Sequence, residues 1–305
     1  MKKTSIIIFC YNRPKHLKKL INLLKEIKNR KIYIICDGPK NNENDTIVVK
    51  KVRKLINCTN LKISKKNFLE KNVGVRKIFS IGMDWVFKYE NKIIVLEDDI
   101  IPSHSFFSFC DILLNKYKNI KKISQITGCN VNDKITKNLK ETYFLSKYSN
   151  IWGWATWKDR WKAYDNNFKN LNNLLNSNFF RKLCPSKNEN KFWRKYFNIH
   201  YKNKSIGTWD YAWTFANFYK KRLSIVPKYN LIKNIGFDIG SGINPKKLSK
   251  LKKREINFSI KHLKILSPNN EYDKYCSGAI YSIPKLTWRI KKKFQGFFLI
   301  NKISM

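Results

Sequence analysis

Short apolar runs alternate with helical patterns over the first 130 residues. The runs are rich in β-branched residues and predict buried strands over 5–9, 31–36, 61–64 and 92–96. Apolar residues recur at helical spacing between these runs, over 14–27, 48–56 and 75–86. Strands that alternate with helices are typical of a mixed, mostly parallel central sheet flanked by helices, so we expect an α/β, Rossmann-like fold.

The pattern changes beyond about residue 130, where the chain becomes rich in Trp and Asn and alternates less regularly. We therefore divide the chain into an α/β half over 1–130, a Trp-rich half over 131–245 and a basic, aromatic tail over 246–305. Such a density of Trp suggests a pocket wall or an acceptor platform, although a single Trp is also common in a core. Both interpretations stay open at this point.

Net charge narrows the classes of partner. The 305 residues include 63 Lys and Arg against 21 Asp and Glu, a net charge of +42. This excess points to nucleic acid, anionic lipid or a phosphorylated substrate. The lysines are spread along the whole chain and no nucleic-acid-binding motif occurs, so we do not expect nucleic acid. A hydrophobic content of 43% excludes a disordered chain.

The cysteines and the apolar run lengths bear on location. The seven cysteines show no short repeated spacing, which favours a reducing cytosol over a disulfide framework. The first apolar run, 5–9, is too short for a signal peptide. No apolar run approaches the ~20 residues that span a bilayer. We therefore expect a cytoplasmic protein, with any membrane contact peripheral.

Three consecutive carboxylates, Glu97-Asp98-Asp99, follow the predicted strand over 92–96. The carboxyl ends of strands form the edge where open α/β sheets bind ligands. Adjacent carboxylates repel one another and are usually offset by a cation or by several hydrogen-bond donors. Mn²⁺ or Mg²⁺ held by one or two carboxylates together with nucleotide phosphates is the ordinary solution. The alternative is a solvated turn after a strand.

Other candidate groups are fewer. The four His residues lie far apart without ligand-like neighbours, so we expect no zinc site, and no phosphate-binding loop motif occurs. Asn72-Val73-Gly74 opens a predicted helix and fits either a backbone donor site for phosphate or sugar, or a simple N-cap. Asp210, flanked by Trp209 and Tyr211, suits a general base whose pKa burial raises, although a helix cap or an ion-pair partner fits equally.

The order of these motifs resembles the GT-A glycosyltransferases, nearest those like N-acetylglucosaminyltransferase I and the bacterial family 2 transferases. The resemblance spans about residues 4 to 242. Its segments are Cys10-Tyr11-Asn12-Arg13-Pro14, Cys36-Asp37-Gly38, Asn72-Val73-Gly74, Val95-Leu96-Glu97-Asp98-Asp99-Ile100, Ile151-Trp152-Gly153-Trp154-Ala155-Thr156-Trp157, the Trp-Asp pair at Asp210, Ile225-Val226-Pro227 and Asn234-Ile235-Gly236. Relatives often have a His in the closing loop, where this chain has Ser241-Gly242-Ile243.

The resemblance assigns a role to each motif. It implies that Asp99 ligates the metal, and that the metal bridges the donor diphosphate. Glu97 and Asp98 are expected to contact the ribose and the donor sugar. The remaining donor-binding residues are expected to be Arg13 and Asp37 at the nucleobase, and Asn72.

The same resemblance places acceptor binding in the Trp-rich half, at Trp152, Gly153 and Trp154. It makes Asp210 the base that takes the proton from an acceptor hydroxyl. The implied enzyme is an inverting glycosyltransferase that moves a hexosyl or N-acetylhexosaminyl group from a nucleotide-diphosphate sugar, with a UDP-sugar as the expected donor. The alternatives are a basic nucleic-acid-binding module and a non-catalytic transferase-like partner protein.

The end of the chain suggests where the acceptor lies. From Trp288 onward aromatic residues mix with Arg and Lys, a pattern that fits contact with an anionic membrane surface. The alternative is that these aromatics pack back on the catalytic domain. Membrane contact would place the enzyme at the inner face of the plasma membrane. We therefore expect a glycan or lipid-linked acceptor of bacterial surface polysaccharide or lipooligosaccharide synthesis.

Overall fold

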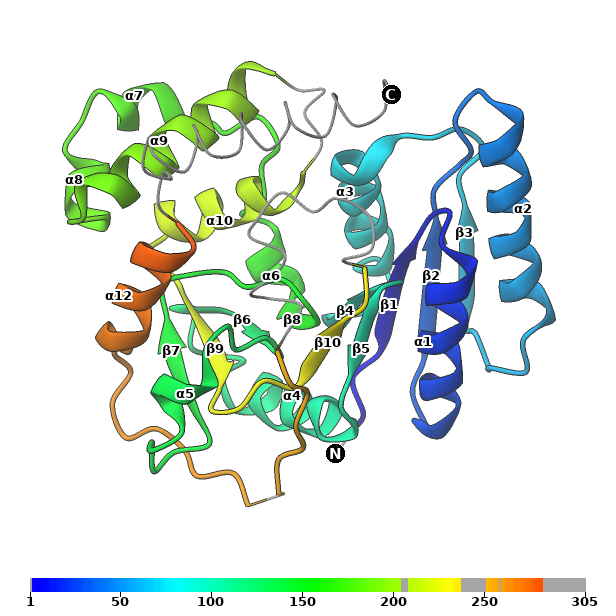
Figure 1. Cartoon of the computed structure of the whole chain (residues 1–305), viewed down its shortest axis with the longest axis horizontal. Coiled ribbons are helices and arrows are strands. Elements are labelled where there is room, and N and C mark those ends of the chain that lie inside the picture. Colours follow the sequence, from blue (N-terminus) through cyan, green and yellow to red (C-terminus); the bar gives the residue numbers. More distant parts are fainter. Residues whose placement is uncertain (1, 204–207, 237–250, 258, 282–305) are drawn as a thin grey trace, which may run out of the picture.

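A mixed sheet forms the centre of the computed structural model, which describes residues 2–203, 208–236, 251–257 and 259–281 (Figure 1). The eight strands run in the order β3-β2-β1-β4-β8-β6-β9-β7. Their bounds are β1 (Ile6–Cys10), β2 (Ile32–Cys36), β3 (Lys65–Phe68), β4 (Lys92–Glu97), β6 (Ile123–Thr127), β7 (Tyr143–Ser146), β8 (Trp154–Trp157) and β9 (Leu223–Pro227). A second, two-stranded sheet pairs β5 (Ile100–Pro102) with β10 (Ile232–Asn234).

Strand directions confirm the expected mixed, mostly parallel α/β sheet. β3, β2, β1 and β4 pair in parallel, and so do β6 and β9. β8 runs antiparallel between β4 and β6, and β7 runs antiparallel to β9. Strands from the predicted halves 1–130 and 131–245 therefore interleave in one continuous sheet.

Helices cover both faces of this sheet, which explains why strands such as β1 and β2 are buried at every position. Ile6 and Ile8 pack with α1 (Pro14–Glu26), α2 (Glu43–Cys58) and α4 (His104–Lys116). Ile7 and Phe9 point to the opposite face and pack with α3 (Gly74–Val86) and α10 (Asp210–Tyr219). The remaining helices are α5 (Asp133–Thr136), α6 (Lys158–Trp161), α7 (Leu171–Leu175), α8 (Phe179–Leu183), α9 (Lys187–Lys202) and α12 (Asn270–Ala279).

The predicted strands over 5–9, 31–36 and 92–96 are confirmed as β1, β2 and β4, and the predicted helices as α1, α2 and α3. The strand predicted over 61–64 is wrong, because β3 begins at Lys65. β3 is an edge strand whose lysines are exposed, so it lacks the apolar signal of a buried strand. Leu61, which prompted the prediction, packs into the core ahead of the strand.

Four stacked aromatic rings join the sheet to the helices of one face. The ring of Phe9 on β1 stacks on Phe79 of α3, and Phe79 stacks on Trp209, with 4.0 Å between ring centroids in both pairs. Trp209 in turn stacks on Trp154 of β8 at 5.4 Å. Gly82 makes room for this column, since a Cβ there would lie 2.4 Å from the Phe9 ring. We call these four residues the aromatic column.

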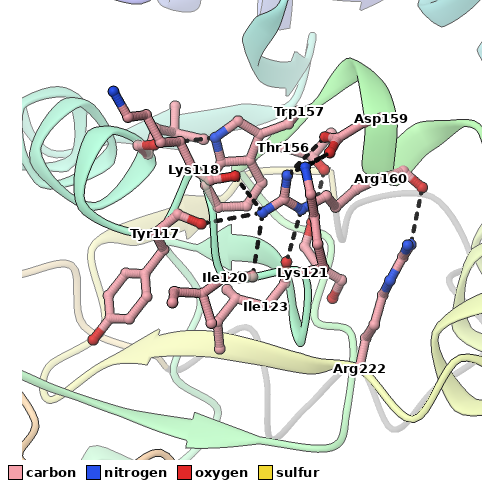
Figure 2. Close-up of polar contacts among 12 residues, drawn as sticks. Tyr117, Lys118, Ile120, Lys121, Ile123, Thr156, Trp157, Asp159, Arg160 and Arg222 are labelled. Atoms are coloured by element: carbon pink, nitrogen blue, oxygen red, sulfur yellow. Dashed lines mark hydrogen bonds and ion pairs between the residues drawn. The ribbon is translucent and has the colours of Figure 1, made fainter.

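A buried guanidinium fixes the strand that carries Trp154. Arg160, on α6 directly after β8, is 1% exposed, and Figure 2 shows its side chain surrounded by oxygen acceptors. It donates to the carbonyls of Ile123 and of the turn after α4, and pairs with Asp159. Its charge lies 4.3 Å from the Trp157 ring centroid. Because a buried cation needs all its partners, this cluster holds β8 against the end of α4.

Two sequence predictions fall outside the described residues: the basic aromatic tail from Trp288, and the loop at Ser241-Gly242-Ile243. The structure therefore does not address membrane contact through the tail. Within the ranges that the structure describes, no helix combines the length and the apolar character needed to cross a membrane.

We expect Gly82→Ala to destabilise the protein by about 1–3 kcal/mol, because the added methyl group would push into the Phe9 ring in a close-packed core. Gly278→Ala is the matched control. Gly278 lies near the end of helix α12 with open space around it, so alanine should stabilise the protein by up to ~1 kcal/mol. Urea unfolding of both variants measures the difference. Equal, small effects would show that Gly82 does not limit packing.

Candidate functional site

The acidic run lies at the carboxyl end of β4. Glu97 ends β4, Asp98 and Asp99 form the turn, and Ile100 begins β5. β4 pairs in parallel with β1, so this turn lies beside the residues that follow β1. The backbone N–H of Asp98 donates to the carbonyl of Phe9, and the N–H of Tyr11 donates to Asp98 Oδ2 at 3.4 Å.

Arg13 supplies the positive charge next to these carboxylates. Its guanidinium donates to Asp99 Oδ2 at 2.7 Å and lies 3.9 Å from Asp98 Oδ1. The Arg13 side chain is 31% exposed, so the ion pair is reached by solvent and can rearrange when another charge arrives. The resemblance implies that Arg13 contacts the nucleobase, which stays a prediction; in the structure its guanidinium lies against the acidic turn.

Asp210 lies close enough to act electrostatically on this acidic turn. Burial raises the pKa of Glu97 well above its ordinary value, and the charges of Asp99, Asp98 and Asp210 raise it further. Burial also raises the pKa of Asp98 to about 7, with Asp99 adding to the rise and Arg13 opposing it. The pKa of Asp210 is raised by burial and opposed by a hydrogen bond from Thr208. The fold thus gathers four carboxylates from two distant segments, which we call the carboxylate cluster.

The aromatic column sets the position of Asp210. Trp209 is 2% exposed, and Asp210 follows it as the first residue of α10. The backbone amides of Asp210 and Tyr211 hydrogen-bond to the Asp210 carboxylate and lower its pKa. This partly offsets the cost of burial, as expected for a carboxylate at a helix N-terminus.

Two further residues adjoin Asp210 and were not singled out from the sequence. The Thr208 side chain hydrogen-bonds to the Asp210 carboxylate, and His200 Nε2 lies 3.3 Å from Thr208 Oγ1. The ring of His200 stacks on Tyr211 with centroids 4.2 Å apart. Thr208 stands two residues before Asp210, which is ordinary spacing near a helix start. Nothing in the sequence links His200 to it.

The Asp37 carboxylate accepts hydrogen bonds from four residues of the protein. Its Oδ1 accepts the backbone N–H groups of Gly38 and Val73, each at 2.9 Å. Its Oδ2 accepts the Gly74 N–H at 3.0 Å and the Asn72 side-chain amide at 3.1 Å. Asp37 therefore ties the end of β2 to the start of α3. Nucleobase contact by Asp37 and donor contact by Asn72 stay predictions.

The expected acceptor segment divides between core and loop. Trp154 is 1% exposed and belongs to the aromatic column. Trp152 is partly buried and packs against two apolar clusters of the core. Gly153 has a φ of +57°, and a Cβ there would lie 2.5 Å from the Ile232 side chain, so the backbone needs glycine. Contact of the three with an acceptor stays a prediction.

The segment after β10 covers Asp99. The N–H of Ile235 donates to the Asp99 carbonyl at 2.9 Å, and the carbonyl of Ile235 lies 3.1 Å from His16 Nε2. Gly236 packs so closely that a Cβ would lie 2.0 Å from Asp99 Oδ2. Access to that oxygen therefore runs past Arg13 and Gly236.

The donor set at the acidic turn fits a hard divalent cation with few protein ligands. Asp99 offers carboxylate oxygens beside Asp98, and Mg²⁺ or Mn²⁺ commonly takes one or two carboxylates and completes its shell with phosphates and water. Over the part of the chain that the structure describes, no group of three or more His, Cys, Asp or Glu side chains forms a cage for a metal ion. A cation here would therefore have to be completed by substrate oxygens and would compete with Arg13.

Two surface hollows are lined by residues other than those of this site. One hollow of about 410 Å³ is lined by Ser80, Asp84, Trp161, Tyr164 and neighbouring residues, and another of about 450 Å³ lies over residues 165–173 and Tyr201. Neither is lined by a member of the carboxylate cluster. Charge and convergence of side chains indicate the site.

No known family model matches the chain, and no curated protein matches it in sequence. The α/β fold and the geometry of the carboxylate cluster therefore carry the functional argument.

We expect Asp37→Asn to cost about 1–3 kcal/mol of unfolding free energy, because the new amide would turn its own N–H groups toward buried donors and leave them unpaired. Asp165→Asn is the matched control, since Asp165 accepts the amides of Asn167 and Lys169 in an exposed turn where water can replace it. Chemical denaturation of both variants checks this. An Asp37→Asn loss no larger than the control would contradict the anchoring role.

Proposed function

We propose that this chain is an inverting GT-A-type glycosyltransferase. The observation that carries the proposal is the carboxylate cluster at the carboxyl edge of the sheet. Glu97 ends β4, Asp98 and Asp99 follow it in the turn, and Asp210 begins α10. A buried group of like charges costs folding free energy, so a fold that assembles one from two segments favours a role in binding or chemistry.

Asp210 is the general base of this proposal. Burial raises the pKa of its carboxyl, which makes Asp210 a stronger base than an exposed aspartate. It removes the proton of an acceptor hydroxyl as that oxygen forms a bond to the anomeric carbon. The bond from that carbon to the diphosphate breaks on the opposite side, and the electron pair leaves with the nucleoside diphosphate. One such displacement inverts the anomeric centre.

In this proposal Glu97 and Asp98 contact the ribose and the donor sugar, as the resemblance implies. Arg13, which pairs with Asp99 in the structure, can turn its guanidinium toward a phosphate. Mn²⁺ or Mg²⁺ held at Asp99 would neutralise charge on the departing diphosphate. The protein's own part in that step is to hold carboxylate and guanidinium side by side at the sheet edge.

The expected donor is a UDP-sugar that carries a hexosyl or N-acetylhexosaminyl group. The expected acceptor is a glycan or lipid-linked hydroxyl of bacterial surface polysaccharide or lipooligosaccharide synthesis, reached from the cytoplasmic face of the membrane. These assignments come from the resemblance of the motifs, and the +42 net charge is compatible with a phosphorylated donor.

A panel of nucleotide sugars, assayed with Mn²⁺ and with EDTA, tests the function directly. A donor that binds the native state raises the melting temperature, by an amount that grows with its concentration over Kd. We expect one nucleotide sugar to stabilise the protein and to be slowly hydrolysed. If no nucleoside diphosphate or nucleotide sugar stabilises it, the proposal is wrong.

We predict that Asp99→Asn weakens binding of the nucleoside diphosphate in the presence of Mn²⁺, because it removes one negative charge from the cation site. Calorimetric titration with and without Mn²⁺ measures this. Asp133→Asn, which removes a carboxylate on α5 that pairs with Arg254, is the control and should bind as wild type. Equal affinities in wild type and Asp99→Asn would remove the metal assignment.

We predict that Asp210→Asn leaves donor affinity unchanged and lowers kcat by about 10²–10⁴-fold, the usual contribution of a general base. Turnover with an identified acceptor, measured beside donor titration, separates the two effects. A kcat within about threefold of wild type would assign Asp210 a structural role only.

A further inference from the structure

His200 on α9 contacts the base through one intervening side chain. The ring is 4% exposed and is held at both nitrogens: Nδ1 lies 2.7 Å from the Tyr196 carbonyl oxygen, and Nε2 lies 3.3 Å from Thr208 Oγ1. Thr208 also hydrogen-bonds to the Asp210 carboxylate. Asp210, Thr208 and His200 thus form a continuous chain of hydrogen-bonding groups.

The contacts fix where protons can sit. A carbonyl oxygen only accepts hydrogen bonds, so Nδ1 of His200 carries a proton and donates it to Tyr196. The Thr208 hydroxyl has a single proton, which can point to Asp210 or to His200 Nε2 but not to both. Its direction therefore depends on the charges of the two neighbours.

One added proton completes this chain. With Asp210 ionised and His200 neutral, the Thr208 proton points to Asp210, and lone pairs of Thr208 Oγ1 and His200 Nε2 face each other. After Asp210 takes up a proton, it donates to Thr208 Oγ1, and Thr208 donates to Nε2, so every contact holds one proton. An ionised Asp210 with a doubly protonated His200 uses the same number of protons and is equally complete.

We propose that His200 is a positioning residue that receives, through Thr208, the proton that Asp210 removes from the acceptor. The inference rests on the proposed function. As the acceptor oxygen bonds to the anomeric carbon, its proton passes to Asp210. Asp210 then gives a proton to Thr208 Oγ1, and Thr208 gives its own proton to His200 Nε2, where it is held until the products leave and it returns by the same path to Asp210 and from there to solvent. Asp210 is thereby ionised again for the next turnover.

The charged and titratable surroundings suit shared protonation. His200 faces Arg76 of α3, which donates to the His200 carbonyl, Tyr196 of its own helix, and Tyr211 and Asp210 of α10. Burial lowers the pKa of His200 and Arg76 adds to the fall, while the Tyr196 hydrogen bond and the charge of Asp210 raise it.

Asp210 itself lies near Glu97 of β4 and the phenols of Tyr164 and Tyr281. Burial raises the pKa of Asp210 and lowers that of His200. Burial therefore moves the two pKa values toward each other.

Nitrogen-15 NMR of the histidine side chains tests the coupling without any substrate. We expect the pKa of His200 to fall in Asp210→Asn, because a nearby negative charge is removed. We expect Thr208→Val to shift the Nε2 resonance, and Thr208→Ser, which keeps the hydroxyl, to restore it. His262, which bonds to the Tyr143 hydroxyl, is the reference in the same spectra and should not move.

A His200 that titrates alike in wild type, Asp210→Asn and Thr208→Val would overturn the proposal. The reference resonance of His262 reports whether each variant is folded, and Thr208→Ser preserves the shape of the site if Thr208→Val does not fold. This measurement does not depend on sugar transfer. Coupling without any nucleotide-sugar binding would therefore contradict the proposed function and leave the proton chain standing.

Kinetics provides the second test once an acceptor is identified. Thr208→Val should lower kcat about tenfold or more and change its pH profile, with KM for the donor nearly unchanged. Thr208→Ser should retain the wild-type profile. An unchanged pH profile in Thr208→Val, together with a large loss in Asp210→Asn, would leave Asp210 as the base and remove His200 from its proton path.

Discussion

The aromatic column is the constraint on which the candidate site depends. Phe9, Phe79, Trp209 and Trp154 come from β1, α3, the start of α10 and β8, segments far apart in the sequence. Buried aromatic rings contribute large apolar areas and a preferred stacking geometry. Trp209 stacks on this column. The fold thereby holds the next residue, Asp210, near Glu97 at the end of β4, which is distant in the sequence.

Acidic residues are scarce in this chain, and their placement is informative. The chain has 21 Asp and Glu residues, and some of the buried ones pair with a cation. Asp111 pairs with Arg30, and Glu189 pairs with Lys147 and accepts a hydrogen bond from the Tyr148 hydroxyl. The carboxylate cluster differs because Arg13 pairs with only Asp99 at close range. Among the described residues, acidic groups without a close cationic partner therefore gather at this edge of the sheet, and their pKa values are raised.

The sequence predicts what depends on neighbours in the chain. β1, β2 and β4 can be predicted because both their faces are apolar. Glu97-Asp98-Asp99 can be located because it stands at the end of the apolar run that predicts β4. β3 is missed, because an exposed edge strand needs no apolar pattern. The approach of Asp210 to Glu97 cannot be read from spacing, and only the resemblance suggested it. The contacts of Asp37 and the link from His200 to Thr208 arise from tertiary packing, which no local pattern encodes.

The helix starts near the carboxyl edge are already filled by the protein's own acids. The amides that open α3 are bonded to Asp37, and those that open α10 are bonded to Asp210. In many parallel α/β proteins such amides bind phosphate. In the proposed function that task would fall to cationic side chains such as Arg13, or to a bound cation. Attraction between mobile charges is screened by ions far more than hydrogen bonding to fixed amides, so the affinity of this edge for any anion should depend strongly on ionic strength.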